Sequence, residues 1–215
     1  MPIDFYYAPY SPPCWSVLMV AEALDLELNL KIVKTSDGEH LTPEYLKMNP
    51  QHTVPTIVDN GFALWESRAI ITYLVNKYGK GSPLYPEDPQ ARALVDQRLY
   101  FDISTLYQRY MDYLIPQMLE PADEAKLKKV EEALGFVETF LEGRQYIAGD
   151  NLTLADYSIA ASVISFNSVG IDAFKTPRIK AWFERVKTVP GFSKSEEGAK
   201  LFGNVVKEMI NKKSS

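Results

Sequence analysis

The spacing of apolar residues divides the chain into two parts with different periods. In the first 80 residues, β-like runs mix with stretches of helical spacing, and Leu26, Leu28, Leu30 and Ile32 alternate with polar neighbours as in a half-buried strand. Beyond a Gly/Pro-rich segment at 79–89, apolar residues recur every three or four positions almost to the end. The pattern predicts a mixed α/β domain over 1–80 and an all-helical domain over 89–215.

Local signals set the order of elements in the first part. Asn60-Gly61 joins two β-rich runs as a hairpin turn. Thr42 suits a helix N-cap before Pro43. The predicted order is β-α-β-α-β-β-α, with strands or helices over 3–8, 14–24, 24–33, 42–49, 53–67 and 67–79. In the second part, helices are predicted over 89–118, 124–143, 153–166 and 177–190.

Composition and charge narrow the class of protein. The 215 residues are 46% hydrophobic, and 28 acids against 23 bases give a net charge of −5. This balance argues against a nucleic-acid or anionic-membrane surface, because both need an excess of clustered Lys and Arg. No apolar stretch approaches the ~20 residues of a membrane span, Met1 leads directly into a strand without a leader-like segment, and a single cysteine suits a reducing compartment. We expect a cytoplasmic protein.

The stretch Ser11-Pro-Pro-Cys14 is the first candidate for chemistry. Its spacing is that of a redox Cys-x-x-Cys pair in which an oxygen replaces the first sulfur. From the residues alone, either Ser11 or Cys14 could be the reactive group.

Two further stretches are ambiguous. Pro55 at the start of a strand is either an ordinary edge proline or a cis-proline that leaves the backbone of Val54 free to pair with a peptide-like ligand. Glu66 and Ser67 stand where a strand passes into a helix. They are either caps or, with the free N–H groups of the helix, a site for an α-amino acid end.

The remaining candidates are histidines and tyrosines. His40 and His52 are the only histidines and lack the companions of a metal site, so we expect no metal; they are surface residues or contacts to a carboxylate. Tyr107, Tyr110 and neighbouring aromatic residues follow helical spacing, which is typical of a core but also fits a wet apolar cleft.

Together these stretches resemble the cytosolic glutathione transferases, most closely the insect delta class. The similarity extends over essentially the whole chain and rests on NPQHTVPTIVDNGFALWESRAI (49–70), QRLYFD (97–102) and IAGDNLTLAD (147–156). The resemblance implies a thioredoxin-like N-terminal domain, a C-terminal helical bundle and a homodimer.

The resemblance also implies a role for each matching residue. Ser11 is then the catalytic serine that hydrogen-bonds the glutathione sulfur. Asp102 does not touch glutathione in this scheme but supports Arg68, which does. Glutathione is held by three groups: Glu66, Ser67 and Arg68 at the γ-glutamyl end, Val54 with Pro55 at the cysteinyl unit, and His40 with His52 at the glycyl carboxylate. The electrophile pocket would be lined by Pro13, Thr35, Tyr107, Tyr110, Leu114, Met118 and Phe202.

The sequence departs from the class pattern around the serine. Tyr10 replaces a small residue, Trp15 replaces an arginine, and Thr35-Ser36 replaces Leu-Gln. We expect these positions to affect the second-substrate pocket or the start of the helix more than glutathione binding.

The resulting expectation is a detoxifying glutathione transferase that joins the glutathione thiolate to hydrophobic electrophiles, with dehydrochlorinase or peroxidase side activity as a further option. One alternative is a thiol-disulfide reductase that uses Cys14. Another is a carrier that binds glutathione or hydrophobic ligands without turnover. The sequence favours Ser11 as the reactive residue, with Cys14 facing inward from the helix as a small hydrophobe.

Overall fold

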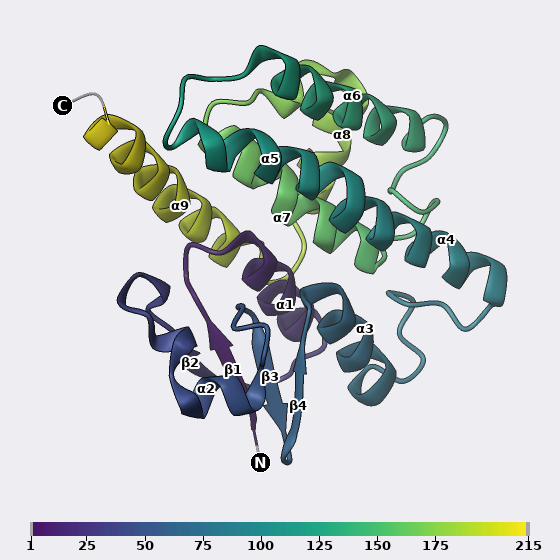
Figure 1. The fold of residues 1–215 in the computed structure, drawn as a ribbon. Coiled ribbons are helices and arrows are strands. Elements are labelled where there is room, and N and C mark those ends of the chain that lie inside the picture. The colour runs from purple at the N-terminus through teal and green to yellow at the C-terminus, as the bar shows by residue number, and fades with distance from the viewer. Residues whose placement is uncertain (1, 214–215) are drawn as a thin grey trace.

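The N-terminal part is a small mixed α/β domain. The structure is a computed structural model that describes residues 2–213 (Figure 1). The elements confirm the predicted β-α-β-α-β-β-α order of a thioredoxin-like domain, with two 3₁₀ turns (Thr35–Asp37 and Glu39–Leu41) before the second helix. In chain order they are β1 (Ile3–Tyr7), α1 (Pro12–Ala23), β2 (Leu28–Ile32), α2 (Pro43–Met48), β3 (Thr56–Asp59), β4 (Phe62–Trp65) and α3 (Ser67–Tyr78).

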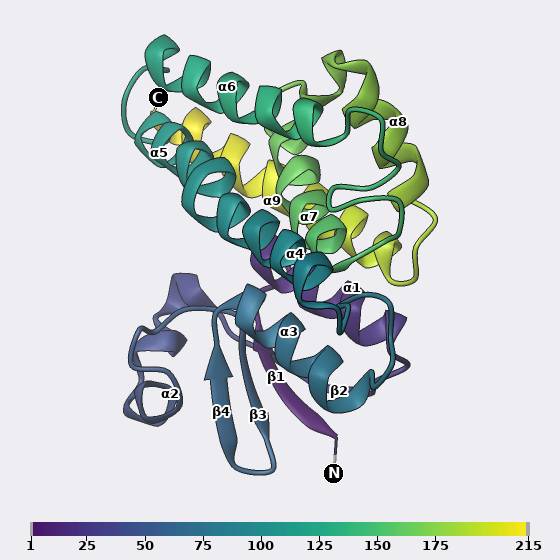
Figure 2. The same cartoon turned by 90° about the vertical axis from the view of Figure 1, so that its right-hand side faces the viewer.

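The four strands form one mixed sheet in the order β2-β1-β3-β4. β1 pairs in parallel with β2 and antiparallel with β3, so that Phe5 stands opposite Leu30 on one side and Ile57 on the other. Phe5 and Ile57 are fully buried, whereas Leu30 on the edge strand is 48% exposed. Figure 2 shows α1 and α3 between the sheet and the helical part, with α2 on the far side of the sheet. The N-termini of α1 and α3 therefore lie near the boundary between the two parts.

The local signals act as the sequence predicts. The Thr42 hydroxyl accepts a hydrogen bond of 3.4 Å from the backbone N–H of Tyr45 at the start of α2. Asn60 and Gly61 both have positive φ (49° and 86°), as a two-residue hairpin turn of type I′ requires.

The end of β3 is tied to α3 by one buried carboxylate. Asp59 Oδ2 accepts hydrogen bonds from the hydroxyls of Tyr73 and Tyr78, both 2.6 Å long, and from Lys77 Nζ at 2.7 Å. Burial alone would raise the pKa of Asp59, but the hydrogen bonds from Lys77 and the two tyrosines outweigh it and lower the pKa to about 2.

This cluster predicts an acid-dependent loss of stability. Because the folded-state pKa of Asp59 lies below its unfolded value, its contribution is complete above about pH 4 and disappears as the pH falls toward 2. Asp59→Asn should lower the free energy of unfolding at pH 7 by about 2 kcal/mol, since hydrogen bonds to a charged group are weakened. Thermal unfolding of both proteins from pH 7 to pH 2 should show the two Tm values converging. A constant Tm difference over that range would contradict this prediction.

The C-terminal part is helical, and its first helix differs from the prediction. The uninterrupted helix expected over 89–118 is wrong in detail, because a π-helical segment at Asp102–Leu106 separates α4 (Pro89–Phe101) from α5 (Tyr107–Gln117). Single π turns absorb one extra residue in a helix and are frequent at functional sites. The other helices are α6 (Glu124–Phe140), α7 (Leu154–Ser168), α8 (Pro177–Val186) and α9 (Phe192–Lys213), with a short 3₁₀ turn at Ala173–Lys175.

The helix α9 was not predicted, because its sequence is rich in polar residues and contains Gly198 and Gly203. Both glycines allow close packing: a Cβ on Gly198 would lie 2.2 Å from Trp15 Nε1, and one on Gly203 would lie 2.6 Å from the backbone oxygen of Ser168. Trp15 is 1% exposed, donates a 2.8 Å hydrogen bond to the Pro9 carbonyl and packs edge-on against Phe202. Trp15 therefore lies in the first turn of α1, one of the two places expected for it, and contributes to the α1–α9 contact.

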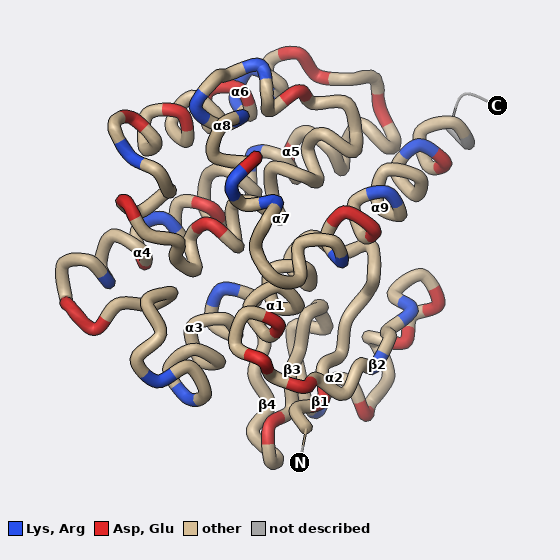
Figure 3. The backbone as a smooth tube through the Cα atoms, turned by 180° about the vertical axis from the view of Figure 1, so that it is seen from behind, with Lys and Arg blue, Asp and Glu red and all other residues tan. Residues whose placement is uncertain are grey.

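The distribution of charged and apolar residues over the helices bears on what surfaces the protein presents. Basic and acidic positions are interspersed along the helices that Figure 3 shows from behind. Among residues 2–213, no helix combines the length and the apolar character needed to span a membrane.

Candidate functional site at the start of helices α1 and α3

Ser11 occupies the N-cap position of α1. Its backbone is extended (φ −95°, ψ 114°), and its side chain makes no capping hydrogen bond to the helix. Its backbone N–H donates to the Ala8 carbonyl at 3.0 Å, which fixes the loop after β1. The half-buried hydroxyl thus stands at a helix N-terminus, where unpaired N–H groups favour a negative charge.

Cys14 lies on the inner side of the same helix turn. It is fully buried, as the sequence predicts. Burial raises the pKa of the thiol to about 12, although hydrogen bonds with the Ser11 side chain and the Ala8 backbone partly offset the effect. A thiol that is neutral and enclosed at neutral pH cannot attack a disulfide, so the structure argues against a reductase that uses Cys14.

The second helix N-terminus carries the predicted acid and hydroxyl. Glu66 is exposed and takes a positive φ of 70° directly before α3, a conformation that is rare for a residue with a side chain. Ser67 is 3% exposed, and its Oγ accepts a 3.1 Å hydrogen bond from Arg68 Nη1. An exposed carboxylate, free helix N–H groups and a fixed hydroxyl together fit an α-amino acid end, with its ammonium and its carboxylate.

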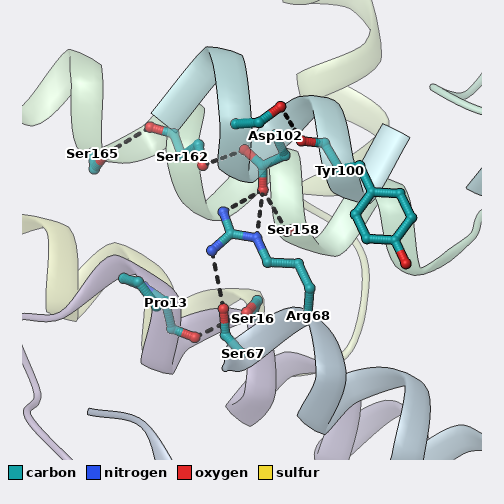
Figure 4. Close-up of polar contacts among 10 residues, drawn as sticks. Pro13, Ser16, Ser67, Arg68, Tyr100, Asp102, Ser158, Ser162 and Ser165 are labelled. Atoms are coloured by element: carbon teal, nitrogen blue, oxygen red, sulfur yellow. Dashed lines mark hydrogen bonds and ion pairs between the residues drawn. The ribbon is translucent and has the colours of Figure 1, made fainter. Parts of the chain in front are cut away.

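Arg68 is held by a carboxylate from the helical part. Arg68 Nη2 and Nε donate to Asp102 Oδ2 at 2.5 Å and 3.2 Å, and Asp102 is fully buried. Ser158 and Ser162 of α7 donate to the same carboxylate at 2.5 Å and 2.8 Å. Figure 4 shows this carboxylate between α7 and the guanidinium: it accepts four hydrogen bonds, and its ion pair with Arg68 connects the two parts of the protein.

The two serines of α7 were missed by the sequence analysis. Their signal is weak, because small hydroxyl residues in an apolar helix usually bond to their own backbone. Only the approach of Asp102 from the π-helical segment gives Ser158 and Ser162 a partner outside their own helix.

The remaining glutathione-site candidates are Val54, Pro55, His40 and His52. The Val54–Pro55 bond is cis. The rings of His40 and His52 are 6.1 Å apart, and His40 Nδ1 is buried without a hydrogen-bond partner among the described residues. Such a pair can donate hydrogen bonds to a carboxylate. No cluster of three or more His, Cys, Asp and Glu suited to a metal ion occurs within residues 2–213.

Two of the unusual positions near Ser11 are paired with each other. The hydroxyls of Tyr10 and Thr35 share a hydrogen bond of 2.6 Å. This bond joins the loop that carries Ser11 to the segment that leads to His40.

The residues expected to line the electrophile pocket differ in burial. Tyr110 is fully buried, donates a hydrogen bond to the Ser165 carbonyl at 3.2 Å and packs against Phe166, and Leu114 is 1% exposed. Both belong to the helical core, and their place in the pocket wall stays a prediction. The other expected lining residues are half-buried: Pro13, Thr35, Tyr107, Met118 and Phe202.

Comparisons with known proteins cover both parts of the chain. Residues 5–83 match the family "Glutathione S-transferase, N-terminal domain", and residues 96–190 match "Glutathione S-transferase, C-terminal domain".

Solved insect structures align over nearly the full length. A delta-class glutathione transferase of Nilaparvata lugens is 50% identical, with a TM-score of 0.94 over 97% of this chain and 100% of that one. Glutathione transferase BmGSTD1 of Bombyx mori is 48% identical, with a TM-score of 0.92 over 95% of this chain and 97% of that one. An epsilon-class enzyme of the housefly, Musca domestica, is 39% identical, with a TM-score of 0.90 over 96% and 98%.

Proposed function

The chain belongs to the glutathione S-transferase family, and from this premise we propose that it transfers the thiolate of reduced glutathione to hydrophobic electrophiles, with Ser11 as the catalytic hydroxyl. The observation that carries the proposal is the hydroxyl of Ser11 at the N-terminus of α1, not used as a cap, beside a buried neutral thiol. Within the family, the insect delta class supplies the near relatives on which the comparison rests.

The proposed pose places glutathione along the edge of the small domain. Its γ-glutamyl end meets the α3 N-terminus at Glu66, Ser67 and Arg68. Its cysteinyl unit pairs with the backbone of Val54 at the cis-Pro55. Its glycyl carboxylate meets His40 and His52. Support comes from the chemistry of these groups, since each offers the partner that one part of an extended tripeptide needs.

The proposed mechanism begins with the sulfur. A free thiol near pKa ~8.5 is only a few per cent thiolate at about pH 7. A hydroxyl donor and a helix N-terminus both favour the charged form, and a shift of about two pKa units corresponds to ~2.7 kcal/mol. The thiol proton passes to solvent, and the thiolate forms a carbon–sulfur bond with an electrophile held against it, either displacing a leaving group such as halide or adding to an activated double bond. Proximity supplies the remaining acceleration.

Electrophiles would enter beside the half-buried residues Pro13, Thr35, Tyr107, Met118 and Phe202. The same thiolate could act as a base in halide elimination or attack a hydroperoxide, so dehydrochlorinase and peroxidase side activities belong to the proposal. A role in detoxification follows from this broad chemistry.

We place the division between the glutathione-binding and helical domains at 81–88, and we expect the protein to act in the cytosol, where glutathione is reduced.

One pair of assays tests the function. The protein is incubated with glutathione and either a chromogenic aryl halide or a disulfide substrate. Conjugation of the aryl halide is expected. Disulfide reduction without conjugation would support the alternative of a thiol-disulfide reductase. Saturable glutathione binding without either reaction would identify a carrier.

We also propose that the protein is a homodimer. Leu94, Tyr100 and Ile103 are exposed on α4 and the π-helical segment, with Tyr100 at 71%. Phe136 of α6 is 41% exposed and lies against Phe101 of α4. Exposed aromatic and aliphatic groups of this kind are enriched at stable interfaces. Sedimentation at micromolar concentration should give twice the chain mass, and a monomer there would contradict the proposal.

A further inference from the structure

The π-helical segment controls which side chains of the long helix face Arg68. The backbone N–H of Tyr107 donates to the carbonyl of Asp102, the five-residue hydrogen bond that defines a π turn. In a regular α-helix of 3.6 residues per turn, residues five apart point about 140° away from each other. The wider turn at 102–106 lets Asp102 and Tyr107 approach the same guanidinium.

Asp102 and Tyr107 contact Arg68 in complementary ways. The Asp102 carboxylate takes two N–H groups at the edge of the guanidinium, and the Arg68 Cζ atom lies 5.5 Å from the centre of the Tyr107 ring. A planar guanidinium binds carboxylates in its plane and aromatic rings over its face. The Arg68 side chain is only 13% exposed, so water screens neither contact strongly.

The immobilised guanidinium in turn fixes the glutathione-facing hydroxyl. Arg68 Nη1 donates to Ser67 Oγ at 3.1 Å. With Arg68 fixed in its plane by Asp102 and on its face by Tyr107, the position of the Ser67 hydroxyl depends on both residues of the π turn.

We propose that Tyr107 is a positioning residue for glutathione, because the π-helical segment brings its ring over Arg68 and the ring holds the Arg68–Ser67 pair in place. The inference rests on the proposed function and deepens it. It moves Tyr107 from electrophile selection to recognition of the γ-glutamyl end. The ring, and not the hydroxyl, carries this role.

The test compares Tyr107→Leu with Tyr107→Phe. The leucine variant should raise the Kd for glutathione about 3- to 10-fold, as expected for a partly desolvated cation–π contact. The phenylalanine variant keeps the ring and should recover most of that affinity. For cysteinylglycine, a thiol without the γ-glutamyl group, the leucine substitution should weaken binding less than it weakens the binding of glutathione. A leucine variant that raises only the KM of the aryl halide would overturn the inference, as would a phenylalanine variant as weak as leucine.

A double-mutant cycle separates positioning from a general loss of structure. In an Arg68→Met background, Tyr107→Leu should have no further effect on glutathione affinity. The matched control is Tyr85→Leu, which removes a ring 4.4 Å from the Arg92 guanidinium outside the site and should leave the Kd for glutathione unchanged. Additive losses in the cycle would refute the inference. Failure of the proposed function would be visible separately, as a wild-type protein that does not conjugate glutathione.

Discussion

Asp102→Ala is expected to lower the free energy of unfolding by about 3–5 kcal/mol and to raise the KM for glutathione. The substitution leaves the largely buried guanidinium of Arg68 without its partner and removes the acceptor of Ser158 and Ser162. Breaking a buried ion pair from one side costs this much because the remaining charge stays away from water. Chemical denaturation and steady-state kinetics measure the two effects.

A surface aspartate provides the matched control for Asp102. Asp112 lies on α5 and accepts a hydrogen bond only from the exposed Gln108 among the contacts described for it, at 2.8 Å. Asp112→Ala should change the stability by less than about 0.5 kcal/mol. If Asp102→Ala were equally mild, the carboxylate would not connect the two domains as we infer.

Ser11→Ala is expected to lower kcat about 10- to 100-fold. A hydrogen bond to a charged group contributes ~1.5–3 kcal/mol, and the hydroxyl is proposed to donate one to the glutathione thiolate. Without this donor the thiolate is less favoured, so the pKa of bound glutathione should rise and the pH–rate profile should move to higher pH. The affinity for glutathione should stay nearly constant, because the sulfur is only one of its contacts. The profile of kcat against pH measures the shift.

Two variants on the same helix are controls for Ser11. Ser16 is a buried serine whose hydroxyl donates to the Pro13 carbonyl at 2.9 Å, so Ser16→Ala should affect stability but not the pH profile. Cys14→Ala should also leave the profile almost unchanged, because that thiol is buried and neutral at neutral pH. If Cys14→Ala were inactive and Ser11→Ala active, Cys14 and not Ser11 would be the catalytic residue.

The sequence by itself determined the elements of the small domain and the burial of Cys14. Thr42 before Pro43 and the Asn60–Gly61 turn act through neighbouring backbone groups, so their outcome does not depend on distant residues. The inward position of Cys14 likewise follows from the apolar face of one helix. Local chemistry of this kind can be read from a sequence because its causes lie within a few residues.

The tertiary structure alone decided how the two domains share the site. Three features of the structure involve partners that are distant in the chain. They are the π turn from Asp102 to Tyr107, the hydrogen bonds of the α7 serines to Asp102, and the packing of the α9 glycines against Trp15 and Ser168. Tyr110 follows the same helical period as Tyr107, yet Tyr110 is buried against Phe166 of α7 and Tyr107 lies against Arg68. Periodicity shows that a helix has an apolar face, but the neighbouring elements determine which part of that face is core and which part meets a ligand.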